Sequence, residues 1–104
     1  MIAAALMMVA QPVPQNALAA ADEANAAYVQ CLFATSRAAS GAHLSADDFE
    51  RKLASACVGE EETLVRTGVA VLRARGHSNA EAAARQLAKD ARRSVLDTYR
   101  QFGP

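Results

Sequence analysis

The chain has 104 residues, and its 11 Lys plus Arg are balanced by 11 Asp plus Glu. This length fits one small domain, and the balance excludes the strongly charged compositions of disordered tails and of proteins that coat nucleic acid. Twenty-six residues are alanines and only 28 apolar residues are larger than Ala, so we expect a thin core. Because alanine favours helices and offers little to pack on a sheet, the composition predicts an all-α fold.

The amino-terminal segment resembles a secretory signal peptide. Residues 2–10 are apolar and uncharged, and Pro12, Pro14 and the small-residue sequence at 17–19 follow them. Nine apolar residues are too few to cross a bilayer core, which needs roughly 20 residues of helix. We therefore expect a signal peptide that is removed, and no stable membrane span after processing.

This interpretation predicts two segments, a signal peptide at 1–19 and a single helical domain at 20–104. No Lys or Arg precedes the apolar run, so either the signal is weak or the true start lies upstream of Met1. The alternative is an apolar amino-terminal helix that docks on the rest of the domain, in which case the protein is cytoplasmic.

Two helices are predicted in the first three quarters of the chain. Residues 17–40 contain no Pro or Gly and repeat larger side chains every three or four residues, which predicts a first helix ending at Gly41. Ser45 has the form of an N-cap residue followed by acids in the first turn. We expect one long second helix over 45–75, with a kink near Gly59.

A third helix is predicted over 78–102. Ser78 and Glu81 have the spacing of a capping box, in which each side chain bonds the backbone amide of the other residue. One stripe of this helix is expected to dock on the first two helices: Ala84, Leu87, Ala88, Ala91, Val95, Tyr99 and Phe102. The predicted architecture is a three-helix bundle, or a helical hairpin plus a third helix.

The two cysteines are expected to join the first two helices. Cys31 lies ten residues before Gly41, and Cys57 lies twelve residues after Ser45. At about 1.5 Å per residue, they lie at similar heights above the connecting turn, so they should face each other. In a small exported domain, two cysteines are most simply one disulfide.

The residues that could support redox, metal or cofactor chemistry are sparse. The cysteines do not form a C-x-x-C pair, and the two histidines, His43 and His77, fall in predicted turns at opposite ends of a long helix. Zinc needs three or four ligands, and covalent haem attachment needs C-x-x-C-H. We therefore expect no catalytic residues, no metal and no cofactor.

Glu60 is the one candidate for a polar site. It falls on the stripe of the second helix that should face the other helices, and Arg37 or a base of the third helix could pair with it. A buried carboxylate with a shifted pKa would mark a site. The alternative is that Glu60 lies at the edge of the stripe while Glu61 and Glu62 are solvated.

The function favoured by these features is a non-enzymatic structural or protein-interaction module that is periplasmic or secreted. The sequence is similar in general character to small bacterial envelope proteins, although no motif of a named family is present. The net charge of +2 on the third helix is too small to predict nucleic-acid binding. We expect the partner to be another protein or a second copy of this chain. The alternatives are a cytosolic adaptor with reduced thiols and a small enzyme or ligand-binding domain centred on Glu60.

Overall fold

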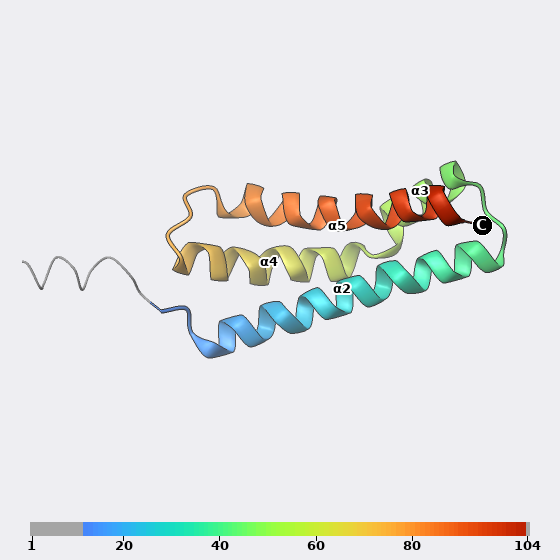
Figure 1. The fold of residues 1–104 in the computed structure, drawn as a ribbon. Coiled ribbons are helices and arrows are strands. Elements are labelled where there is room, and N and C mark those ends of the chain that lie inside the picture. The colour runs from blue at the N-terminus through green and yellow to red at the C-terminus, as the bar shows by residue number, and fades with distance from the viewer. Residues whose placement is uncertain (1–11, 104) are drawn as a thin grey trace, which may run out of the picture.

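The computed structural model describes residues 12–103, which form an all-α domain without strands (Figure 1). Four helices follow one another in the order α2 (Gln15–Gly41), α3 (Ala46–Ala56), α4 (Val58–Ala74) and α5 (Ala80–Phe102). Helix α2 runs along one side, α3 and α4 together form the returning arm, and α5 runs back beside that arm (Figure 1). The chain therefore makes three antiparallel passes.

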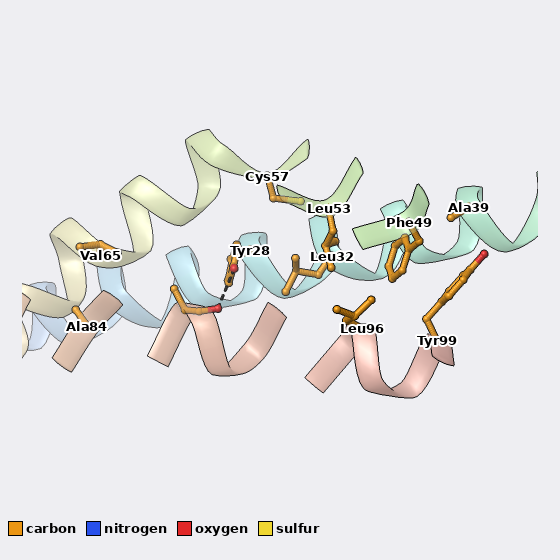
Figure 2. Packing of buried hydrophobic residues seen from close by; sticks show 11 residues of the cluster. Tyr28, Leu32, Ala39, Phe49, Leu53, Cys57, Val65, Ala84, Leu96 and Tyr99 are labelled. Carbon is orange, nitrogen blue, oxygen red and sulfur yellow. Dashed lines mark hydrogen bonds between the residues drawn. The ribbon is translucent and has the colours of Figure 1, made fainter. Parts of the chain in front are cut away.

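The returning arm is not the single long helix that the sequence predicted. It is broken at Cys57, whose φ of −122° and ψ of 32° depart from helical values. A kink was expected near Gly59; the observed break lies two residues earlier, and Gly59 itself lies inside α4. The break allows Phe49 and Leu53 of α3 and Val65 of α4 to enter one core (Figure 2).

The disulfide joins α2 to this break. Cys31 and Cys57 have an S–S distance of 2.10 Å and a Cα–Cα distance of 6.0 Å. Cys57 is buried, whereas Cys31 is partly exposed. The link therefore ties the middle of α2 to the junction of α3 and α4, as the equal-height calculation predicted.

The core is thin and rich in small residues. Its largest fully buried side chains are Tyr28, Leu32 and Phe49, and the Phe49 ring stacks on Tyr99 with centroids 4.2 Å apart. A Cβ atom added at Gly68 would lie 3.5 Å from the Cβ of Ala84. Such small residues let α4 and α5 approach closely, which offsets the shortage of large apolar side chains.

The docking stripe of α5 differs from the prediction at two positions. Leu87 is 62% exposed and Phe102 is 77% exposed, so neither docks this helix. Leu96 is buried instead. Successive helical residues are about 100° apart, and the buried face is centred on Ala88 and Tyr99, which leaves Leu87 turned toward solvent.

The two predicted helix caps have different outcomes. Ser45 is the N-cap residue of α3, and its Oγ accepts a hydrogen bond from the Asp48 amide at 3.1 Å. Helix α5 begins at Ala80 with Asn79 as its N-cap residue, and no side chain caps it. The expected Ser78–Glu81 capping box is therefore wrong. The Glu81 carboxylate pairs with Arg85, one turn further along α5.

Both interhelical turns are Schellman motifs. After α2, the amides of His43 and Leu44 bond the carbonyls of Ser40 and Ala39. After α4, Gly76 takes the equivalent position with a φ of +87°. His43 has a φ of +55°, in the left-handed region that ordinarily favours glycine. The turn after α2 therefore holds a non-glycine residue in an unfavourable conformation.

The predicted signal peptide is mostly outside the described residues. Within residues 12–103, positions 12–14 are non-helical and Pro14 precedes α2, which already includes the small-residue sequence at 17–19. No helix in this part of the chain is long and apolar enough to span a membrane.

Replacing His43 with Gly should stabilise the protein. Glycine adopts the left-handed conformation without the Cβ penalty, and after its greater unfolded-state entropy is counted we expect a gain of about 0.5–1 kcal/mol. Urea denaturation would measure it. His43→Ala is the matched control, because it removes the imidazole and keeps the strain, so it should leave stability nearly unchanged. An equal gain from His43→Ala would contradict the backbone explanation.

Removing the disulfide should be costly. Replacing Cys31 and Cys57 with Ser opens a loop with a sequence separation of 26 residues, and we expect the free energy of unfolding to fall by roughly 2–4 kcal/mol. Thermal and urea unfolding would measure the loss. Either single serine variant should lose a similar amount, and unchanged stability in the double variant would show that the cross-link does not constrain the chain.

Candidate functional site

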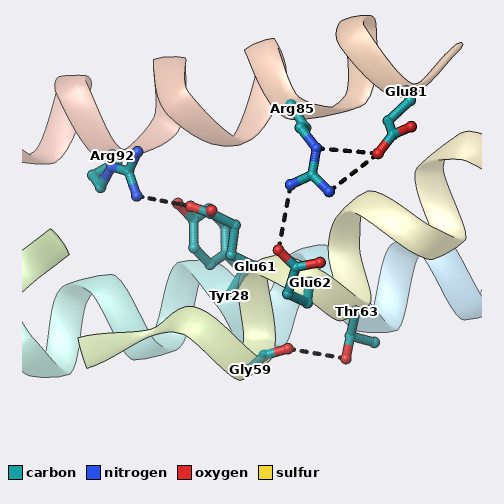
Figure 3. A network of polar contacts seen from close by, with 8 residues as sticks. All are labelled: Tyr28, Gly59, Glu61, Glu62, Thr63, Glu81, Arg85 and Arg92. Carbon is teal, nitrogen blue, oxygen red and sulfur yellow. Dashed lines mark hydrogen bonds and ion pairs between the residues drawn. The ribbon is translucent and has the colours of Figure 1, made fainter. Parts of the chain in front are cut away.

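A polar cluster lies where α2, α4 and α5 meet. The Tyr28 hydroxyl of α2 is 3.1 Å from Glu61 Oε1 of α4 and 3.0 Å from the Ala88 carbonyl oxygen of α5. Arg92 of α5 donates to the same Glu61 oxygen at 2.9 Å (Figure 3). One carboxylate oxygen therefore connects all three passes of the chain.

The break at Cys57 explains why Glu61 holds this position. Helix α4 begins at Val58, and Glu61 lies one turn before Val65, a buried core residue. Residues four apart share a helix face, so Glu61 points into the interface with α5. The Glu61 and Arg92 side chains remain 22% and 31% exposed, which reduces the cost of placing their charges there.

The cluster keeps Tyr28 protonated. Burial of the phenol, followed by its hydrogen bond to Glu61 and the negative charge of that carboxylate, raises the pKa of Tyr28 to about 12. The neutral hydroxyl can then donate a hydrogen bond to Glu61 or to the Ala88 carbonyl oxygen. This arrangement holds the Tyr28 hydroxyl in place as a hydrogen-bond donor between the three helices.

A second ion-pair group lies on the same interface, built on Glu62, the residue after Glu61, and on Arg85, about two turns before Arg92 on α5. Arg85 of α5 bonds Glu62 of α4 at 3.3 Å and Glu81 of its own helix at 3.2 Å (Figure 3). The hydrogen bond with Glu62, then that with Glu81, raises the pKa of Arg85 above its ordinary value. Its three groups are all substantially exposed, so it orients α4 against α5 and adds little stability.

The polar site expected at Glu60 is not formed. Glu60 is partly exposed and Arg37 is exposed, and neither side chain makes an ion pair or hydrogen bond with another described residue. The adjacent Glu61 takes the interior position, because the break at Cys57 changes which residues of α4 face α5. The sequence pattern predicted an inward-facing carboxylate on this segment at Glu60, and the structure has it one residue later, at Glu61.

The other predicted positions do not converge on a reactive site. His43 and His77 are exposed in the two interhelical turns, and the cysteines are bonded to each other. Among residues 12–103, no group of three or more His, Cys, Asp or Glu side chains is placed to hold a metal ion. The Tyr28–Glu61–Arg92 cluster was not predicted from the sequence. The only feature that pointed to it was the run of three glutamates at 60–62.

Tyr28→Phe should reveal the cluster in two measurements. Loss of the hydroxyl should lower the free energy of unfolding at neutral pH by about 0.5–1.5 kcal/mol. Because the folded chain favours the neutral phenol, the contribution of Tyr28 ionisation to stability is full below its ordinary pKa of 10.0 and is lost as the pH rises toward about 12. The wild type should therefore lose stability across this range more steeply than the variant.

Tyrosinate absorbance checks the assignment directly. The chain has two tyrosines, so Tyr99→Phe is the control that should retain the alkaline titration of Tyr28. That mutation removes only the hydroxyl that donates to the Leu44 carbonyl oxygen. Titration of Tyr28 at its ordinary pKa in folded protein would contradict the cluster.

No protein-family model, curated protein or solved structure matches the chain. Its function is therefore inferred from the contacts, burial and charge of its own residues.

Proposed function

We propose that the chain is an exported helical protein, periplasmic or secreted, that acts by binding another protein and not by catalysis. The observation that carries the export part of this proposal is the disulfide between Cys31 and Cys57. Disulfides form and persist in oxidising compartments. A small domain with a thin core also gains most from such a cross-link.

The distribution of buried residues supports removal of residues 1–19. Within the described part of the chain, the first buried residue is Ala24, and all later core positions follow it. Cleavage after Ala19 would shorten α2 by little more than one turn and would remove none of these buried side chains. The core of a domain that starts at residue 20 is therefore intact.

The use of polar groups supports binding over catalysis. Tyr28, Glu61 and Arg92 are engaged with one another across the helices. No buried side-chain nitrogen or oxygen within residues 12–103 lacks a hydrogen-bond partner. Four large apolar side chains are instead half or more exposed and available for contact: Phe33, Val58, Leu87 and Phe102. An enzyme centred on Glu60 has less support, because Glu60 is not part of the cluster.

Expression in a secreting bacterial host should yield a processed, oxidised protein. We expect the mature chain to begin near Ala20 or Asp22, because a short apolar run followed by small residues is a processing signal, and we expect no free thiol. Intact-mass measurement before and after alkylation checks both points. Recovery of a chain that retains Met1 with two free thiols would instead favour the cytosolic adaptor.

Reversible crosslinking in the native host tests the binding role separately. The mature protein should yield a discrete crosslinked species of defined mass that contains a second protein or a second copy of the chain. The Cys31→Ser/Cys57→Ser variant is the control, since it should yield less of this species in proportion to its lost folding. Absence of any defined species from folded, exported wild-type protein would contradict the binding role and leave export unaffected.

A further inference from the structure

The solvent side of the contact between α5 and the returning arm carries three successive grooves, which together we name the α5 seam. A groove of about 830 Å³ lies between α3 and α5, and one of about 380 Å³ lies between α4 and α5. A third, at the turn between α4 and α5, shares Arg73, Glu81 and Arg85 with the second. The seam therefore follows α5 for most of its length.

Most basic residues of the chain line this seam. Of the 11 Lys and Arg residues, seven border the grooves: Arg66, Arg73, Arg85, Lys89, Arg92, Arg93 and Arg100. Arg85, Lys89 and Arg93 follow one another at four-residue steps, so they lie on one face of α5. A chain without net charge thus places most of its positive charge on one side of α5.

The carboxylates of the seam are already engaged. Glu62 and Glu81 pair with Arg85, and Glu50 pairs with Arg100 at 2.9 Å. Asp97 lies 3.9 Å from Arg100, and Asp90 accepts a hydrogen bond from Gln86. The acids without an ion-pair or side-chain hydrogen-bond partner in the described residues all lie outside the grooves: Asp22, Glu23, Asp47 and Glu60.

Four cations of the seam remain without such a partner among the described residues: Arg66, Arg73, Lys89 and Arg93. Lys89 and Arg93 are also four residues apart on one helix, where like charges repel. A carboxylate bound between them would relieve this repulsion. Asp90, which is held only by the neutral Gln86 amide, is the one carboxylate among the described residues of the seam outside an ion pair. The unpaired charge of the seam is therefore mostly positive, and its cations are arranged at helical spacings.

We infer that the α5 seam binds an acidic helical segment of a partner protein. The inference rests on the proposed binding role and names its surface. Carboxylates one or two turns apart on a helix match the spacing of Lys89 with Arg93 and of Arg66 with Arg73. A nucleic-acid backbone fits less well, because its closely and regularly spaced phosphates cannot avoid Glu50, Glu62 and Glu81, whereas carboxylates one or two turns apart on a helix can lie between these acids.

The experiment measures binding of a synthetic acidic probe to the full mature protein. The probe is a helical peptide of about 20 residues, long enough to lie along the seam, with Glu on one face and Leu and Ala on the other. Its Lys-substituted version and a single-stranded DNA of similar length are the comparison ligands. Fluorescence anisotropy gives the affinities, and amide chemical shifts locate the contact.

Two charge-reversal variants distinguish the seam from net charge. Lys89→Glu/Arg93→Glu alters the seam, whereas Arg37→Glu/Lys52→Glu makes the same change in net charge at exposed cations outside it. We expect the seam variant to weaken Glu-peptide binding by about tenfold or more and the control to weaken it by less than about threefold. All four positions are exposed, and circular dichroism would check that both variants fold.

Three outcomes would overturn the inference: equal weakening by both variants, binding of the Lys peptide as tightly as the Glu peptide, or tighter binding of the DNA. Native-host crosslinking with the seam variant separates this inference from the proposed function. If the seam variant yields the same crosslinked species in the same amount as wild type, the partner binds elsewhere. If wild type itself yields none, the binding role fails whatever the peptide does.

Discussion

The disulfide between Cys31 and Cys57 fixes the point at which the returning arm of the chain changes direction. Cys57 is both a bonded residue and the one non-helical position between α3 and α4. With the arm broken there, Phe49 packs on Tyr99 at one end of the core while Val65 packs near Ala84 toward the other end of the core (Figure 2). A straight arm would present a single helix face to α5. The residues at its two ends could then not turn toward α5 independently of each other.

The polar interface follows from the same break. Because α4 starts afresh at Val58, Glu61 faces the junction of all three passes and collects the Tyr28 hydroxyl and the Arg92 guanidinium. A thin, alanine-rich core sets few constraints on how far α4 slides along α5. Directional contacts of this kind select one alignment of the two helices, and the ion pairs of Arg85, about two turns before Arg92 on α5, reinforce it.

Charge is distributed unevenly over a chain that is neutral overall. Apart from Asp90, which bonds only the Gln86 amide, the acids that line the seam form ion pairs with its arginines. The other acids of the described residues without such a partner are on α2, α3 and the outer part of α4. The interior and the seam thus have separate roles. Interior polar groups fix the arrangement of the helices, and the remaining cations of the seam are free to attract a partner, an effect strongest at low ionic strength.

The sequence by itself determined the all-α class, the end of the first helix at Gly41, the cap at Ser45 and the pairing of the cysteines, because these depend on local propensity and on spacing along the chain. Only the tertiary structure decided the break at Cys57, the inward position of Glu61 in place of Glu60, and the exposure of Leu87 and Phe102. Local periodicity favoured one long second helix with a kink near Gly59, whereas a single non-helical residue shifts the phase of every residue after it. Likewise, alanines on several sides of α5 gave the hydrophobic pattern no unique face, so contacts with α3 and α4 selected Leu96 and left Leu87 in solvent.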